Sequence, residues 1–443
     1  MPYTEMETTE FKLTLIAEHA KRNRTMKFMS IAHLLNADFL LSCFKSLNRN
    51  KATGIDNVTW YEYNANLYEN IERLVERLKS KSYTPIPAKR VYIPKGDGKR
   101  RPLGISAIEN KIVELGIKRI LESIYEQDFS NQSFGFRPER SCHHALKEIH
   151  QLVTYNPTNH IVEADIKGFF DNVNHDLLME ALGIRISDKS MLMLIEKFLK
   201  AGYIDDGLLV TSEKGTPQGS ILSPILANVF LHYVLDYWFE NTVKTITRGF
   251  CEIVRYADDF VCTVQYIDDA IKIERMLVER FNKLKLEIHP DKSKRITFGR
   301  FESQSAKKQG RRPNTFTFLG ITHYCTKSRR GGFKIGRKTC RKKFREKCNK
   351  LKAWIKKNRH LPIRVFWDGL AVRLRGHYQY YGVSENSKSI DRFYRVMIKS
   401  VHKWLNRRSQ RGRMTWQKLN DYLNYYPLPR PSIKHSFYTK SMF

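Results

Sequence analysis

Two adjacent aspartates between apolar runs restrict the fold of this chain more than any other feature. Residues 251–262 (CEIVRYADDFVC) place apolar residues on both sides of Asp258 and Asp259, which predicts two short strands joined at a tip. Burying the flanks while exposing the tip would hold both carboxylates rigidly at one end of a sheet. Two negative charges this close are unfavourable without a cation, so the pair predicts a functional site.

The other aspartate pairs carry no such expectation. The pair at 205–206 precedes a glycine in a polar segment and indicates an exposed turn, whereas the pair at 268–269 opens a predicted helix. A third functional carboxylate is instead predicted at Asp165, which ends the strand candidate 161–165. Because side chains alternate along a strand, Glu163 lies on the same side, and the pattern leaves it open as a candidate.

Three carboxylates at strand ends suit nucleotidyl transfer. Joining a nucleotide to a strand needs divalent ions that lower the pKa of the 3′-hydroxyl and stabilise charge on the phosphoryl group. Mg²⁺ prefers oxygen ligands, which carboxylates provide. Asp165, Asp258 and Asp259 are therefore predicted as catalytic metal ligands.

The charge of the chain predicts a polyanionic partner. Its 443 residues include 78 Lys and Arg against 45 Asp and Glu, a net charge of +33, and the excess favours nucleic acid over a membrane surface. Between 327 and 360, sixteen Lys or Arg residues accompany a single acid, Glu346, which predicts contact with phosphates rather than a merely solvated face.

Composition excludes several other classes of protein. The hydrophobic share of 41% excludes a wholly disordered chain. Seven scattered cysteines, none in a Cys-x-x-Cys spacing, support neither a disulfide framework nor a zinc ribbon and fit a reducing cytosol. The acidic start lacks the features of a signal peptide, and polar residues interrupt the apolar stretch 220–239, so we expect a cytoplasmic protein without a membrane span.

The spacing of apolar residues divides the chain into three parts. Helical spacing dominates residues 11–80, and after the basic run helical spacing returns. Between them, from about 88 to 325, short strands alternate with helices, and the strand candidates are 89–93, 161–165, 251–255, 260–265 and 315–324.

Residues 256–259 (YADD) resemble the signature of reverse transcriptases, and the strand carrying Asp165 resembles the partner polymerase motif. The resemblance implies an α+β, right-hand polymerase fold, with fingers and palm built on antiparallel sheet and followed by an all-helical thumb. The implied boundaries are 1–87 for an N-terminal extension and the start of the fingers, 88–325 for fingers and palm, and 326–443 for a basic linker and the thumb, or maturase, domain.

The same resemblance assigns roles around the nucleotide. Two Mg²⁺ ions, which Mn²⁺ can replace, would be held by the three aspartates and the backbone carbonyl of Ile166. Segment 93–105 resembles the part of the fingers that grips the triphosphate, block 133–138 (SFGFRP) matches the family, and segment 215–224 resembles its nucleotide-binding loop. By this resemblance Lys95 and Arg101 would contact the phosphates, and Gln218 and Gly219 would lie beside the nucleotide. Phe170 would act as a gate that excludes a 2′-hydroxyl, the alternative being that it is a core residue. Lys292 would be a general acid, and the primer grip would consist of Phe318, Leu319 and Gly320.

Within the family the chain is most similar to the group II intron type, or maturases. Segment 48–56 resembles their extra N-terminal motif, segments 60–80 and 185–212 fit their insertions, and segment 374–382 resembles their thumb. The implied partners are intron RNA, an RNA template, a DNA primer or target and deoxynucleoside triphosphates, with a homodimer as a further option. Predicted nucleic-acid contacts are Arg337, Lys338, Arg341, Lys342, Lys343, Arg345, Arg375, Tyr378 and Tyr380.

The resemblance also implies where such an enzyme acts and where its primer comes from. It would act in the bacterial cytoplasm and associate with the nucleoid at its DNA target. No Cys/His-rich endonuclease segment follows the thumb-like region, so the primer would come from another source, such as nascent strands at a replication fork.

Two alternatives remain open at this point. A domesticated bacterial reverse transcriptase in defence or repair would share the polymerase motifs, although the maturase-like thumb favours the intron type. A non-catalytic RNA-binding splicing factor would be expected to lose its metal ligands, yet Asp165, Asp258 and Asp259 are all present.

Overall fold

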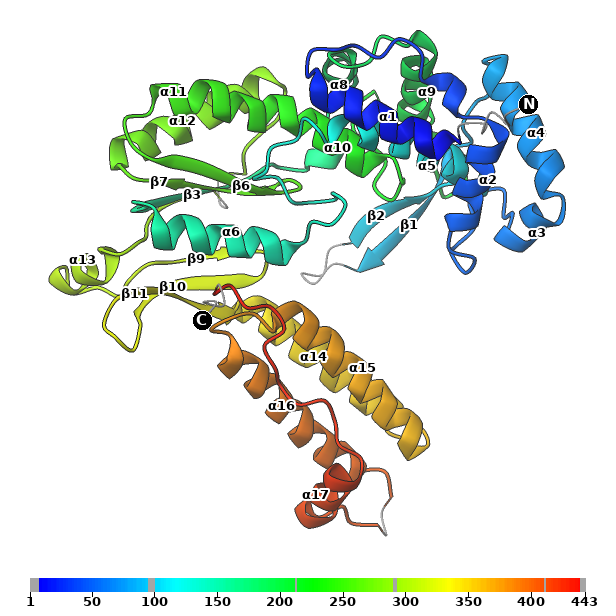
Figure 1. The fold of residues 1–443 in the computed structure, drawn as a ribbon. Helices are drawn as coiled ribbons and strands as arrows, with labels where there is room; N and C mark the ends of the chain where they lie inside the picture. The colour runs from blue at the N-terminus through cyan, green and yellow to red at the C-terminus, as the bar shows by residue number, and fades with distance from the viewer. Residues whose placement is uncertain (1–7, 95–99, 212, 290–292, 410–411, 439–443) are drawn as a thin grey trace, which may run out of the picture.

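The computed structural model describes residues 8–94, 100–211, 213–289, 293–409 and 412–438. Within these residues the chain forms a mixed α/β fold with three small sheets and many helices (Figure 1). No helix of the described part is both long and apolar enough to span a membrane.

The N-terminal region is helical, as predicted. In α4, Ile71, Leu74 and Val75 lie on one face and are buried, as the spacing of the apolar residues indicates. The helices of this region are α1 (Thr9–Arg22), α2 (Ala37–Ser46), α3 (Trp60–Ala65), α4 (Leu67–Lys79) and α5 (Ile108–Tyr125).

The first sheet lies beside these helices and has the strand order β2-β1-β4-β5 (Figure 1). β1 and β2 form the expected antiparallel pair, whereas β1 also pairs with β4 in parallel, a pairing that was not predicted. Its strands are β1 (Ala88–Pro94), β2 (Arg100–Ile105), β4 (Tyr203–Asp205) and β5 (Leu208–Val210).

The second sheet is central and fully antiparallel, in the order β6-β7-β3-β8. Alternate residues of β3 supply two different cores: Val162 packs on the side of α12, and Ile161 on the side of α6. Because both faces are covered, the inner strand β7 is buried from Phe260 to Val264 and is almost wholly apolar there. The elements are α6 (Cys142–Tyr155), β3 (His160–Asp165), β6 (Cys251–Tyr256), β7 (Asp259–Val264), α12 (Ile267–Lys283) and β8 (Lys294–Thr297).

Helices between β3 and β6 complete the middle of the chain. After α10, two π-helical turns lead into the short α11. These elements are α7 (Phe169–Asn172), α8 (His175–Gly183), α9 (Lys189–Lys200), α10 (Ser223–Leu231), the π-helical turns His232–Asp236 and Phe239–Val243, and α11 (Lys244–Ile246).

The third sheet corrects two predictions. Segment 315–324, predicted as one strand, is the hairpin of β9 (Thr315–Phe318) and β10 (Ile321–Lys327), because the left-handed residues Leu319 and Gly320 turn the chain. β11 (Phe333–Thr339) then pairs with β10, so the predicted boundary at residue 326 lies within a strand and the start of the basic run is sheet. The all-helical part begins only at Arg341.

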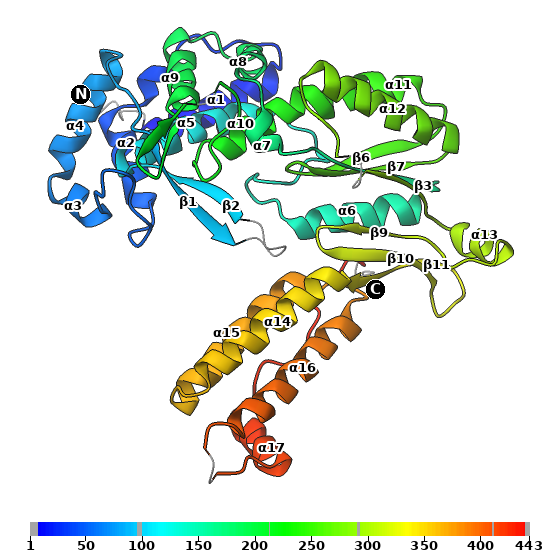
Figure 2. The ribbon, with the colours of Figure 1, turned by 180° about the vertical axis from the view of Figure 1, so that it is seen from behind.

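The C-terminal helices form an arm that projects away from the central sheet in both views (Figures 1 and 2). Phe393, Met397 and Val401 form an apolar stripe along α16, at the helical spacing of this part of the sequence, and are buried in the arm. The short α13 (Glu302–Lys308) precedes β9, and the arm consists of α14 (Arg341–Asn358), α15 (Ile363–Tyr381), α16 (Ser387–Leu405) and α17 (Trp416–Tyr425).

Candidate active site

The aspartate pair occupies a tight hairpin between β6 and β7. Tyr256 pairs with Asp259 across the strands, so Ala257 and Asp258 form a two-residue turn. Ala257 has a φ of +58°, a left-handed conformation that is uncommon for a residue with a side chain. Asp165 is the partner of Asp259 on the neighbouring β3. The register thus brings together the two strand ends that the sequence singled out.

A cavity of about 650 Å³ opens in front of these strand ends. Residues distant in the sequence meet in its lining, and their chemistry is mixed: it includes carboxylates, guanidinium groups, an amide and aromatic rings. Of the predicted site residues, the cavity is lined by Arg101, Asp165, Ile166, Phe170, Gln218, Gly219, Asp258 and Asp259. Lys95 and Lys292, predicted on the phosphates and as general acid, lie outside the described residues.

The loop that carries Gln218 is held against β2 by backbone contact. Gly104 donates its N–H to the carbonyl of Gln218 at 2.6 Å. Gly219, at a φ of +114°, lies so close that an added Cβ would be 2.4 Å from the Gly104 oxygen. Only glycine permits this approach.

A buried carboxylate anchors the other end of the same loop. Glu114 of α5 is 3% exposed, and it accepts the N–H of Ile221 at 2.8 Å and the hydroxyl of Ser106 at 2.9 Å. Burial raises the pKa of Glu114, while these hydrogen bonds act in the opposite direction. Loop, β2 and α5 therefore form one support for Gln218.

Phe170 lies at the border between the loop and the carboxylates. Its carbonyl accepts the N–H of Thr216 at 2.7 Å, and the next residue, Asp171, accepts a hydrogen bond from the Gln218 amide at 2.9 Å. The ring is partly exposed, lines the cavity and makes an edge contact with Phe169, whose side chain is core. Phe170 is thus partly buried against the core and also lines the cavity.

Phe136 is a cavity residue that sequence reasoning assigned no role. It is 48% exposed, has a φ of +59° and contacts the Phe170 ring edge to face at 6.3 Å. The available signal was its position after Gly135 in the block 133–138, where an aromatic residue is placed in a turn rather than on a helix or strand stripe.

Glu163, left open by the alternation of β3, does not join the aspartates. Its carboxylate accepts the N–H of Thr317 at 2.9 Å and so connects the central sheet to β9. Desolvation raises the pKa of this carboxyl. Strand alternation alone could not reveal this contact, because β9 reaches Glu163 from 154 residues further along the chain.

The other aspartate pairs lie at a turn and at the start of a helix, as predicted. Asp205 ends β4 at the exposed β4–β5 turn and accepts the Tyr92 hydroxyl at 2.5 Å. Asp269, near the start of α12, accepts the N–H groups of Arg248 at 3.2 Å and Gly249 at 2.9 Å.

The carboxylates provide the chemistry that a hard divalent cation needs. Among the described residues, no three His, Cys, Asp or Glu side chains are arranged to hold an ion by themselves. Asp165 and Asp259 are nevertheless cross-strand partners, and Asp258 precedes Asp259 at the edge of the same cavity. Mg²⁺ commonly takes one or two carboxylates and completes its coordination with water and substrate phosphates. The donor set therefore fits such an ion in the presence of a triphosphate.

The predicted primer-grip residues form the β9–β10 turn. Leu319 and Gly320 have φ values of +49° and +74°, and Phe318 is buried, so the turn presents backbone rather than the Phe318 ring. Tyr380 of α15 donates its hydroxyl to the Leu319 carbonyl at 3.0 Å, which links the arm to this turn.

Two predicted nucleic-acid contacts are wrong. Arg337 and Tyr378 are each 1% exposed. The Arg337 guanidinium lies 4.7 Å from the ring centroid of Phe437, and burial lowers its pKa to about 10, whereas Tyr378 belongs to the core of the arm. The remaining candidates are exposed, namely Lys338, Arg341, Lys342, Lys343, Arg345, Arg375 and Tyr380.

Comparison with known proteins identifies the class of enzyme. Residues 93–323 match the family described as reverse transcriptase (RNA-dependent DNA polymerase), a match that includes the hairpin, β3 and the loop of Gln218. The chain belongs to this family and is an RNA-directed DNA polymerase by class.

Individual relatives indicate which type of reverse transcriptase the chain resembles. Protein YkfC of Escherichia coli (strain K12) is 38% identical over 275 residues, covering 54% of this chain and 71% of YkfC. The group II intron-encoded protein LtrA of Lactococcus lactis subsp. cremoris is 38% identical over 241 residues, covering 54% of this chain but only 40% of LtrA. A putative COX1/OXI3 intron 2 protein of Saccharomyces cerevisiae is 34% identical over 287 residues, covering 62% of this chain and 33% of that protein. The predicted resemblance to the group II intron type is confirmed.

Proposed function

We propose that this chain is the reverse transcriptase of a group II intron, which binds its intron RNA, assists splicing and copies the RNA at a DNA target. The observation that carries the proposal is the single cavity at which the carboxylate hairpin, the end of β3 and the Gln218 loop meet. The intron-encoded relatives support the RNA partner.

The three parts of the chain correspond in this proposal to a right hand. The first sheet and the N-terminal helices are the fingers, the central sheet is the palm, and the arm of α14–α17 is the thumb. The β9–β10 turn lies between palm and thumb, where Tyr380 connects it to α15, and this supports its role as the primer grip.

In the proposed mechanism the residues of the chain bind the metal ions and orient the nucleotide. Asp165, Asp258, Asp259 and the carbonyl of Ile166 would hold two Mg²⁺ ions, for which Mn²⁺ can substitute. When bound, these ions supply Lewis acidity toward the primer 3′-hydroxyl and the triphosphate. Phe170 would lie beneath the sugar and exclude a 2′-hydroxyl.

Gln218 and Arg101 would bind other parts of the nucleotide. Gln218, fixed by its amide contact with Asp171 and by the backbone of Gly104, would position the nucleotide. Arg101 would bind its phosphates, because a guanidinium matches phosphate oxygens in pairs.

Primer extension on an RNA template with Mg²⁺ tests the assignment. An Asp258→Ala, Asp259→Ala double variant should lose extension, because it removes carboxylates from the metal site. The matched control changes the aspartate pair on the exposed β4–β5 turn, Asp205→Ala with Asp206→Ala, and should retain extension. Normal extension by the first variant refutes the catalytic role.

Splicing of the precursor RNA tests the intron role separately. The chain should accelerate splicing of a precursor that carries its own intron, and it should do so with the Asp258→Ala, Asp259→Ala variant as well. Extension without any effect on splicing would instead support a stand-alone polymerase.

A further inference from the structure

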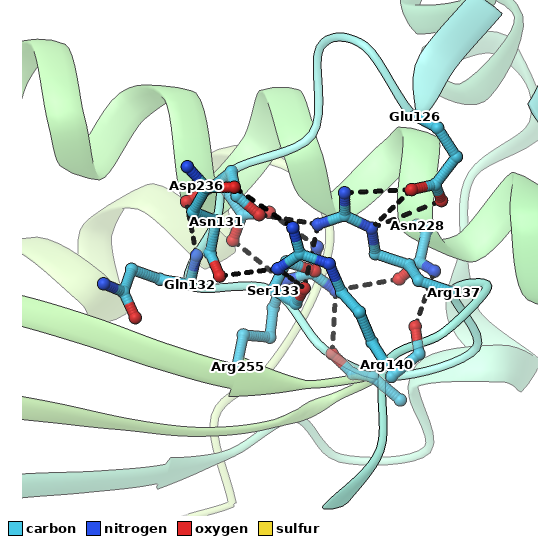
Figure 3. A network of polar contacts seen from close by, with 12 residues as sticks. Glu126, Asn131, Gln132, Ser133, Arg137, Arg140, Asn228, Asp236 and Arg255 are labelled. Atoms are coloured by element: carbon cyan, nitrogen blue, oxygen red, sulfur yellow. Dashed lines mark hydrogen bonds and ion pairs between the residues drawn. The ribbon is translucent and has the colours of Figure 1, made fainter. Parts of the chain in front are cut away.

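An arginine without solvent exposure lies directly behind the carboxylate turn. Arg255, the penultimate residue of β6, is 0% exposed. Its Nε donates to Asp236 Oδ1 at 2.8 Å and its Nη2 to Asp236 Oδ2 at 2.5 Å, and the Asp236 side chain is only 2% exposed. The pair is thus bidentate and fully removed from water (Figure 3).

The remaining guanidinium nitrogen of Arg255 contacts the turn itself. Nη1 donates to the carbonyl of Ala257 and to the side-chain oxygen of Asn228, both at 3.0 Å. The amide of Asn228 in turn donates to the carbonyl of Gly135 at 2.8 Å. One buried network therefore joins β6, α10 and the loop before α6 (Figure 3). Through Nη1 of Arg255 it reaches Ala257, the residue that precedes Asp258.

The turn receives backbone support from its other side. Residues 132–135 run beside β6, since Phe134 N–H donates to Arg255 O at 2.9 Å and Arg255 N–H donates to Gln132 O at 2.8 Å. A Cβ added to Gly135 would lie 2.2 Å from the nitrogen of Ala257. The left-handed Ala257 is consequently enclosed between a glycine backbone and a guanidinium.

This enclosure explains how an unfavourable conformation persists. A residue with a side chain holds a left-handed φ only where its surroundings over-determine it, and such residues gather at functional sites. Asp236 itself lies in a π-helical turn, another feature that is frequent at functional sites. A buried ion pair contributes little to stability compared with apolar residues of similar size, so stability alone does not account for this one.

We propose that Arg255, oriented by Asp236, is a positioning residue of the polymerase: it holds the carbonyl of Ala257 and thereby fixes the direction in which Asp258 leaves the turn. The role rests on the proposed function of Asp258 as a metal ligand. Arg255 does not face the cavity and does not touch substrate, so it acts only through the turn.

The test replaces both members of the pair, because removing one would leave a buried charge without a partner. Arg255→Met with Asp236→Leu removes both charges together and deletes the contacts to Ala257 and Asn228. The matched control is Arg185→Met with Asp128→Leu, a second buried pair whose side chains are 1% and 6% exposed and which lies away from the turn. Hydrogen exchange, metal dependence and single-nucleotide incorporation are measured on full-length protein.

The positioning role has a specific signature. Amide exchange at 256–259 should become at least tenfold faster without substrate, kcat should fall about 100-fold, and the Mg²⁺ concentration for half-maximal rate should rise. The affinity for primer–template should stay within twofold of wild type, and the control pair should change none of these quantities. Wild-type exchange and wild-type kcat in the Arg255 variant would overturn the proposal.

A neutral substitution keeps the test decisive if the double variant does not fold. Asn228→Ala leaves the ion pair intact but removes both the acceptor for Arg255 Nη1 and the donor to the Gly135 carbonyl, so we expect faster exchange at 256–259 and a smaller loss of kcat. Unchanged exchange in Asn228→Ala would then overturn the proposal. Failure of the wild-type chain to extend primers would refute the proposed function, whereas exchange at the turn still reports on Arg255 by itself.

Discussion

Replacing Gly219 with alanine should move the Gln218 loop away from β2. Gly219 has a φ of +114°, which side-chain-bearing residues rarely adopt, and its missing Cβ would lie 2.4 Å from the Gly104 oxygen. That oxygen belongs to backbone and cannot rotate away as a side chain can. The loop and the strand must therefore separate.

The size of the effect follows from this geometry. Ordinary van der Waals contact begins near 3.4 Å, so the two backbones must move apart by about 1 Å. The unfavourable φ costs about 1–3 kcal/mol, and stretching the 2.6 Å hydrogen bond from Gly104 to Gln218 costs about 1 kcal/mol more. A displacement of about 1 Å at a positioning residue can reduce a rate about 100-fold.

The assay is single-nucleotide incorporation on a primed RNA template, together with urea unfolding. We expect kcat/KM for the nucleotide to fall about 100-fold and the free energy of unfolding to fall by about 2–4 kcal/mol. Gly310→Ala is the matched control, because Gly310 also has a positive φ, +64°, but has no atom within 4 Å of the added Cβ. Incorporation by Gly219→Ala within threefold of wild type would refute the reasoning that this contact positions Gln218.

Three further predictions concern other parts of the molecule. Burial lowers the pKa of His232 to about 4; the unfolded chain takes up this proton near 6.5, so the free energy of unfolding should fall as pH drops from 6.5 toward 4. In urea titrations His232→Gln should lose about 2 kcal/mol less than wild type between pH 6.5 and 5. Glu163→Ala removes the acceptor for the β9 amide and should raise the KM for primer–template, while Glu163→Gln, which keeps an acceptor oxygen, should resemble wild type. Lys342→Glu with Arg345→Glu should reduce the salt dependence of RNA binding, whereas Arg337→Met should change stability without changing the salt slope, and equal slopes for both variants would contradict the burial argument.

The sequence by itself determined the elements that depend on neighbouring residues. Apolar runs on both sides of Asp258 and Asp259 are sufficient to predict the hairpin, because a strand is recognisable over about five residues. The helix stripes of α4 and α16 follow from the same local periodicity. The location of Asp165 at a strand end was predictable for the same reason.

Contacts between distant segments were decided only by the tertiary structure. Arg337 has the sequence context of a phosphate-binding residue, but Phe437, 100 residues later, covers it. Glu163 shares a strand face with Asp165, yet β9 takes its carboxylate. Arg255 looks like one more basic residue before the turn until Asp236 reaches it from a π-helical turn. Burial of a charge depends on what the rest of the chain brings to it, and local periodicity carries no information on that.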